Sequence, residues 1–188
     1  VAAQWALKTG RRLETKHVKL APTLDLIGEI WEDRPALPCG RVWALGAEYA
    51  GKSAVEKLAD VRRVMAEKDA DAHVLTSLDD IAWLLNIRGD DIPCTPVALA
   101  YLVVEQEETF LFIDEGKLDG AVREHLDSLN VRIQPYGSIY GFVARYGEGC
   151  SVLLWSERVN FALYDVLARE AILVDAVNPT MLAKAVKN

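Results

Sequence analysis

The clearest local pattern with chemical meaning is Gly46-Ala-Glu-Tyr-Ala-Gly51-Lys52-Ser53, which matches the phosphate-binding consensus G-x-x-x-x-G-K-S/T. It lies between an apolar run and a helical one, as a nucleotide-binding loop requires. Backbone N–H groups would then surround phosphates, Lys52 would reach their oxygens, and Ser53 would hold Mg²⁺. Asp114, which ends another apolar run, would supply a second carboxylate for that metal. The alternative is an ordinary turn from strand to helix, with Ser53 as the helix cap and Asp114 as a turn former.

Other residue types that often form reactive sites are scattered along the chain. The histidines and cysteines number three each and are widely separated: His17, His73, His125, Cys39, Cys94 and Cys150. They form no H-x-x-x-H, H-E-x-x-H or C-x-x-C spacing, so neither a metal site nor a disulfide framework is predicted. Structural histidines and reduced thiols are expected, which fits a cytoplasmic protein.

The acidic pairs favour structural roles. Asp80 follows Ser77 at the spacing of a capping box, and Asp79 lies in the first helical turn, where negative charge is favoured. Arg88 follows this apolar helix in a polar loop over 86–96, where a fixed guanidinium would point at a neighbouring cleft. The residues alone favour the other interpretation of Arg88, a surface ion pair with Asp90 or Asp91 worth under ~1 kcal/mol.

Composition limits the classes of protein that fit. The chain has 188 residues and a formal net charge of -7, with half of its residues hydrophobic, as in a single globular domain. Lysine and arginine are scattered, so a nucleic-acid partner is not expected. No apolar run approaches the ~20 residues of a membrane span, and no signal peptide is evident. The N-terminal Val1 indicates a piece cut from a longer protein.

Apolar periodicity predicts strands that alternate with helices. The expected strands are 41–45, 72–76, 97–104, 109–113, 131–134, 151–155 and 172–176, and the expected helices are 1–12, 53–65, 77–85, 121–129, 139–145 and 161–169. A hairpin joins 97–104 to 109–113, and 17–20 fits a further short strand. The fold class is α/β, with a mixed, mostly parallel sheet of about six strands flanked by helices. The irregular segment 22–40 carries Leu26, Ile27, Ile30 and Trp31, which predicts an arm laid across the domain.

Three runs of residues resemble a known family when taken in order. They are Ile30-Trp31-Glu-Asp33-Arg34-Pro35, then Lys57-Leu58-Ala59-Asp60-Val-Arg62, then Leu75-Thr-Ser-Leu78-Asp79-Asp80-Ile81-Ala82-Trp83-Leu84-Leu-Asn86-Ile-Arg88-Gly89. The pattern resembles the middle, creatinase/prolidase N-terminal-like domain of the long, three-domain Xaa-Pro aminopeptidases. Trp5 to Leu13 is similar to the end of that family's first domain. The run Ala183-Lys184-Ala185-Val186-Lys187-Asn188 is similar to the start of its catalytic domain.

The resemblance implies four parts of the chain. These are the end of a preceding domain (1–20), an irregular arm (21–40), the creatinase/prolidase N-terminal-like domain (41–182) and the start of a missing catalytic domain (183–188). The parent would be a manganese-dependent, homodimeric enzyme that releases the N-terminal residue from peptides with proline second. Its metal ligands would lie in the catalytic domain, so this chain would hold no metal or cofactor and would be inactive alone. It would act as a scaffold between the N-terminal and catalytic domains, and Asn86, Arg88 and Asp90 would line the cleft for the proline-containing peptide.

The same resemblance offers another explanation of the phosphate-loop match. The family has a similar Leu-Gly-x-x-Tyr-x-Gly-x-Ser run, which accounts for Gly46, Tyr49, Gly51 and Ser53 without a nucleotide. Only Lys52 then completes the consensus, and we interpret the match as a coincidence. A small nucleotide hydrolase that uses this loop is the alternative function.

Overall fold

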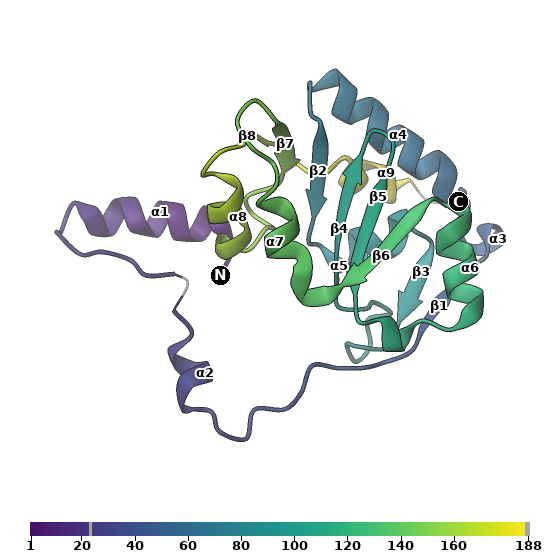
Figure 1. The fold of residues 1–188 in the computed structure, drawn as a ribbon, viewed down its shortest axis with the longest axis horizontal. Helices are drawn as coiled ribbons and strands as arrows, with labels where there is room; N and C mark the ends of the chain where they lie inside the picture. Colours follow the sequence, from purple (N-terminus) through teal and green to yellow (C-terminus); the bar gives the residue numbers. More distant parts are fainter. Residues whose placement is uncertain (23, 187–188) are drawn as a thin grey trace.

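The central element is a six-stranded sheet. The computed structural model describes residues 1–22 and 24–186. The sheet consists of β2 (Ala72–Leu75), β4 (Ala100–Glu105), β5 (Thr109–Ile113), β6 (Val131–Pro135), β7 (Ser151–Leu154) and β8 (Ile172–Asp175), in the order β6-β5-β4-β2-β7-β8 (Figure 1). The pairs β2–β4 and β4–β5 are antiparallel, and the other three pairs are parallel. The predicted mixed, mostly parallel sheet is therefore confirmed, and so is the hairpin, although β4 begins three residues later than expected.

Helices cover both faces of this sheet. On one face lie α4 (Ala54–Glu67), α5 (Leu78–Leu84) and α6 (Gly120–Ser128), and α9 (Pro179–Ala185) packs on α4 and α5. On the other face lie α1 (Ala3–Glu14), α7 (Ile139–Val143) and α8 (Phe161–Leu167). The short helices η1 (Glu115–Lys117) and η2 (Tyr136–Ser138) follow β5 and β6. Within the described residues no helix is long and apolar enough to cross a membrane.

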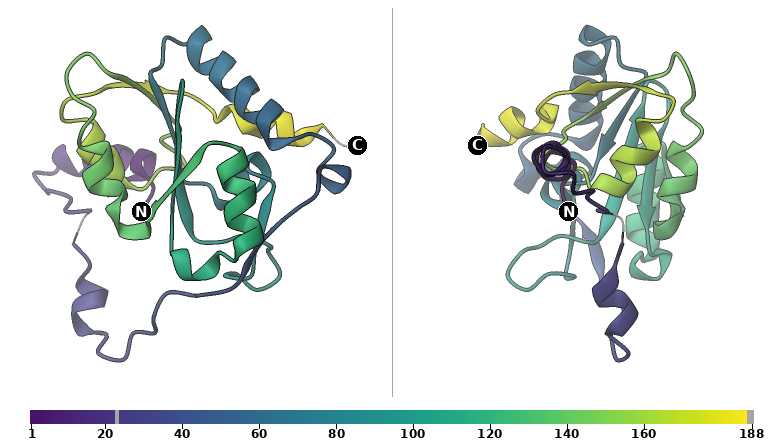
Figure 2. Two further views of the ribbon diagram at one scale, coloured as in Figure 1. Left: turned by 45° about the vertical axis from the view of Figure 1, so that its right-hand side comes forward. Right: turned by 90° about the vertical axis from the view of Figure 1, so that its left-hand side faces the viewer.

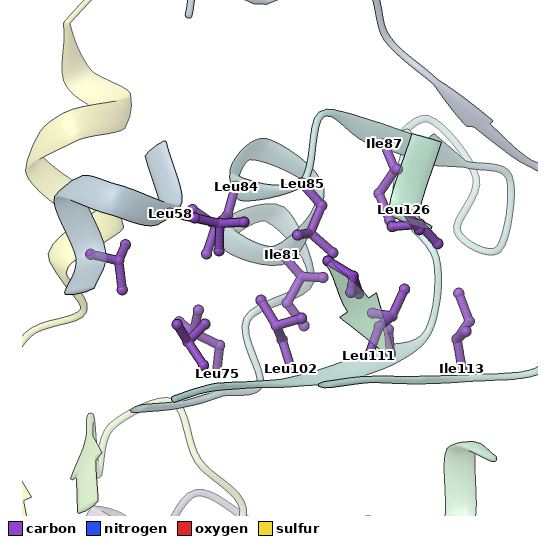
Figure 3. Close-up of a cluster of buried hydrophobic side chains, with 14 of the residues drawn as sticks. Leu58, Leu75, Ile81, Leu84, Leu85, Ile87, Leu102, Leu111, Ile113 and Leu126 are labelled. Carbon is purple, nitrogen blue, oxygen red and sulfur yellow. The ribbon is translucent and has the colours of Figure 1, made fainter. Parts of the chain in front are cut away.

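A hydrophobic core fills the space between the sheet and the first group of helices. Figure 3 shows Leu75, Leu102, Leu111 and Ile113 rising from the sheet toward side chains of the overlying elements, among them Leu58, Ile81, Leu84 and Leu126. Helix α4 begins with the predicted capping box, in which Ser53 Oγ accepts from Glu56 N and Glu56 Oε2 accepts from Ser53 N. This cap sets the start of α4, and the apolar stripe of that helix then faces the sheet.

Several local predictions were wrong. The predicted loop 86–96 contains β3 (Ile87–Gly89), which pairs antiparallel with β1 (Val42–Ala44) in a separate two-stranded sheet. The turn after β1 contains one helical turn, α3 (Ala47–Ala50), and 17–20 forms no strand. Strand β3 has three residues and no alternation, so its pairing with distant β1 is not visible in local sequence.

The arm does not lie across the domain. It contains α2 (Leu26–Ile30), none of whose residues is buried, and both figures show α2 apart from the sheet and its helices (Figures 1 and 2). The four apolar residues expected to be buried are 46 to 80% exposed: Leu26, Ile27, Ile30 and Trp31. Within the arm, Asp25 accepts from Gly28 N at 3.0 Å and pairs with Arg34 at 2.8 Å.

Candidate functional site

Asn86 organises the connection between α5 and β3. It adopts φ 52°, a left-handed conformation that asparagine tolerates better than most residues, and its side chain is buried. Its Oδ1 accepts from Lys57 Nζ at 2.6 Å, and its Nδ2 donates to Lys52 O at 3.0 Å. One amide therefore ties this loop both to α4 and to the segment that precedes α4.

Lys57, the first residue of the second run that resembles the family, is a buried cation. Its side chain is 1% exposed, its Nζ donates to Trp83 O at 2.9 Å, and the ammonium lies 4.2 Å from the centre of the Trp83 ring. Burial, followed by the nearby charges of Arg88 and Lys52, lowers the pKa of Lys57 to about 8. It forms no ion pair with any residue that the structure describes.

Arg88 is fixed against the last turn of α5. Its Nη1 donates to Ala82 O at 3.0 Å and to Ile87 O at 2.8 Å, and burial lowers the pKa of its guanidinium. Among the described residues no acidic side chain pairs with it, so the alternative of a surface pair with Asp90 or Asp91 is not realised. Lys57 and Arg88 both bind carbonyls at the C-terminal end of α5, where the helix dipole favours positive charge.

The two acids beside Arg88 have separate environments. Asp91 is buried and pairs with buried Lys117 at 2.6 Å, and it also accepts from the backbone N–H groups of Gly40 and Leu99. Asp90 is exposed, and its backbone N–H donates to Arg41 O. The structure thus brings Asn86 and Arg88 together at the end of α5, and it places Asp90 on the surface.

The backbone of the phosphate-loop match is used within the loop itself. The N–H groups of Tyr49, Ala50 and Gly51 donate to carbonyls of Gly46 and Ala47 in the turn of α3. Donors that point into a helical turn are not free to surround a phosphate.

The side chains of the match also have protein partners. Lys52 forms an ion pair with Asp60, and Ser53 Oγ bonds to the Glu56 carboxylate at 2.6 Å. Asp114 accepts from Gly116 N at 3.0 Å and caps η1. Each of these side chains therefore has a local structural role.

The residues described here do not fit a metal site. Across 1–22 and 24–186, no cluster of three or more His, Cys, Asp and Glu side chains could hold an ion. His73 is buried with Nδ1 3.0 Å from Leu153 O, His125 Nε2 lies 2.8 Å from Leu85 O, and His17 is exposed. Burial lowers the pKa of His73 to about 4, so its ring is neutral at physiological pH.

The capping role predicted for Asp80 was wrong. Ser77 precedes α5 but its side chain makes no cap, and the buried Asp80 carboxylate instead contacts Asn178 and Lys184 near α9. One sequence signal pointed to the burial of Asp80, because it lies one helical turn before Leu84 on the same face of α5, but that signal does not identify its partners.

Comparison with known proteins places these observations in a family. The profile described as Creatinase/Prolidase N-terminal domain matches residues 33–188. An Xaa-Pro aminopeptidase of Caenorhabditis elegans is 36% identical, with 96% of this chain and 30% of that protein covered. One from Dictyostelium discoideum is also 36% identical, with 88% and 26% covered. The chain thus spans under a third of the length of these relatives.

Solved structures give the same result. The crystal structure of X-prolyl aminopeptidase from C. elegans, described as a cytosolic enzyme with a di-nuclear active site, matches with a TM-score of 0.89 and 34% identity. That match covers 100% of this chain and 31% of the other. The Xaa-Pro dipeptidase from Bacillus anthracis, at TM-score 0.53 and 11% identity over 72% of this chain and 37% of its own, shares the fold alone. The chain therefore belongs to the creatinase/prolidase N-terminal domain family.

Proposed function

We propose that the chain is the non-catalytic scaffold domain of a manganese-dependent Xaa-Pro aminopeptidase that releases the N-terminal residue from peptides with proline second. The observation that carries this proposal is similarity over 96% of this chain to an Xaa-Pro aminopeptidase of which it covers only 30%. The di-nuclear site described for the C. elegans enzyme supports a metal-dependent parent. Since the described residues offer no cluster of ligands, the metals would be held by another part of the protein.

Exposed apolar residues support contacts with further domains. Large apolar side chains are exposed on the arm at Ile27 and Ile30, and on α9 and just after it at Leu182 and Val186. In the proposed arrangement these side chains would be covered by the neighbouring domains. In this arrangement 1–20 ends a preceding domain, and 183–188 begins the catalytic domain of a cytoplasmic, homodimeric parent.

Arg88 is the residue that we propose to face the substrate cleft, with Asn86 holding its loop and Asp90 on the loop surface. Its Nη1 is anchored to two carbonyls, which leaves the rest of a pre-oriented guanidinium without an acidic partner among the described residues. Such a guanidinium is suited to bind a carbonyl or carboxylate of a peptide. The chain contributes shape and one positive charge to the cleft, and the metal site would supply the hydrolytic chemistry.

The test compares this chain with the full-length protein that contains it. With Mn²⁺ and an Xaa-Pro peptide, we expect turnover by the full-length protein and none by the 188-residue chain. An Arg88→Ala change in the full-length protein should raise KM, whereas Arg169→Ala, which removes an exposed arginine paired with Asp165, should not. Turnover by a clean preparation of the short chain, or unchanged kinetics of Arg88→Ala, would contradict the corresponding part of the proposal.

A further inference from the structure

An ionic contact joins α9 to the beginning of α5. Lys184 Nζ lies 2.5 Å from Asp79 Oδ2 and 2.5 Å from Asp80 Oδ1. The two acids differ in burial, since the Asp80 side chain is 1% exposed and that of Asp79 is 66% exposed. Burial alone would lower the pKa of Lys184, but the two carboxylates outweigh it and raise the pKa above its ordinary value. The ammonium is therefore held between one buried and one exposed acid.

A second contact fixes the start of α9. The buried Asn178 precedes this helix, and its Nδ2 donates to Asp80 Oδ2 at 2.9 Å. Asp80 thus binds both the residue before α9 and the last turn of that helix. We call Asp80, Asn178 and Lys184 the α5–α9 clamp.

Helix α9 depends on such contacts. It has seven residues, well below the length at which an isolated helix is stable in water. It lies against α4 and α5, and Leu182 on its outer side is exposed. The clamp therefore provides specific anchoring for a helix with little stability of its own.

The opposite end of α5 holds the candidate site. Arg88 Nη1 donates to Ala82 O, and Lys57 Nζ donates to Trp83 O. Because α5 spans only Leu78–Leu84, the two sets of contacts lie toward the two ends of one short helix. A shift in the position of the N-terminal turn of α5 would therefore move the carbonyl groups that orient Arg88.

We propose that Asp80 is a positioning residue that anchors α9 through Lys184 and Asn178 and thereby sets the orientation of Arg88. The anchoring of α9 follows from the contacts of this chain alone, whereas the effect on peptide binding rests on the proposed function. Asp79 is the matched control, because it binds the same lysine from an exposed position and exposed ion pairs contribute little. Loss of one partner of a buried charge pair is far more damaging.

The first experiment measures amide hydrogen exchange in the 188-residue chain. In Asp80→Asn we expect exchange of the α9 amides to rise about tenfold or more, while Asp79→Asn stays near the wild type. Lys184→Met, which keeps most of the aliphatic stem and loses the charge, should reproduce the Asp80→Asn result and serves if that variant fails to fold. Equal α9 exchange in the wild type and both of these variants would overturn the anchoring.

The second experiment uses the full-length protein and an Xaa-Pro peptide. Asp80→Asn should raise KM more than it lowers kcat, and should have little further effect in an Arg88→Ala background, because both changes act through the same guanidinium. Independent, additive effects would overturn the link to Arg88, since a merely structural role predicts additivity. If the wild-type protein does not cleave the peptide, the proposed function and this link fail together, and the exchange experiment alone decides the anchoring of α9.

Discussion

The buried pair of Asp91 and Lys117 offers the strongest test of what holds this domain together. Their side chains are 0 and 3% exposed, and Asp91 Oδ2 lies 2.6 Å from Lys117 Nζ. The same carboxylate accepts from Gly40 N at 2.9 Å and from Leu99 N at 2.6 Å. Asp91 therefore joins the end of the arm, the segment before β4 and η1 through one side chain.

Asp91→Ala removes all of these interactions at once. It leaves a buried ammonium without a partner, for which the expected cost is about 3–5 kcal/mol. The N–H groups of Gly40 and Leu99 also lose their acceptor, although these costs overlap and do not simply add. We expect a loss of about 4 kcal/mol in the free energy of unfolding, a large part of the ~5–15 kcal/mol typical of a domain.

Urea unfolding followed by circular dichroism measures this loss. The slope of the unfolding free energy against urea concentration should match the wild type, which checks that the same transition is being observed. Asp165→Ala is the control, because it removes an exposed pair with Arg169 at 2.9 Å and should cost under about 1 kcal/mol. Asp91→Asn should fall between the two, since it keeps one acceptor and loses the charge. If Asp91→Ala costs no more than Asp165→Ala, the reasoning about buried charge in this domain is wrong.

Three further predictions concern single groups. Burial lowers the pKa of His73 in the folded state to about 4, from its ordinary 6.5, so the unfolded state binds this proton more readily and stability should fall as pH drops from 6.5 to 4. Melting temperatures measured across this pH range should show the fall in the wild type, and His73→Gln should lack this contribution. The pKa of Lys57 is about 8 in the folded state, below its ordinary 10.5. Between pH 8 and 10.5 the unfolded chain therefore binds this proton more than the folded one. The Lys57 side chain should therefore add stability as pH rises from 8 to 10.5, and Lys57→Met should lack this contribution. If the difference in unfolding free energy between wild type and Lys57→Met does not change over this pH range, the prediction is wrong. Ser53→Ala removes the capping box of α4 and should cost about 1 kcal/mol in urea unfolding, with Ser128→Ala at an exposed helix end as the control.

The parts of the fold that could be predicted depend on interactions between near neighbours in sequence. Ser53 and Glu56 lie three residues apart, so the spacing of the two residues is enough to predict their capping box. The hairpin of β4 and β5 likewise follows from two apolar runs with a short charged link. Strand β3 is different, because it exists only through its pairing with β1, more than forty residues earlier in the chain. Local periodicity carries no signal for such a short, distant pairing.

The candidate site could be predicted only in part, because several of its contacts join residues that are far apart in the sequence. Arg88 and Asn86 could be singled out because they follow an apolar helix in a polar loop, but the anchoring of Arg88 to Ala82 O could not. Asp80 follows Ser77 at capping-box spacing, so local sequence favoured a cap. Its actual partner Asn178 lies 98 positions later. A buried polar residue is satisfied by whichever group the fold brings near, and that group is invisible to a local pattern.

The phosphate-binding consensus illustrates a related point, because here the residue types match a motif that the backbone does not form. The consensus specifies residue types, whereas anion binding depends on where backbone N–H groups point. Here Gly51 adopts φ 71° as the left-handed end of α3, and its N–H donates to Ala47 O within that turn. The positive charge of Lys52 is already paired with Asp60. The glycine and the lysine are thus accounted for by a helix end and an ion pair, and residues 46–51 form a helical turn instead of an anion-binding loop.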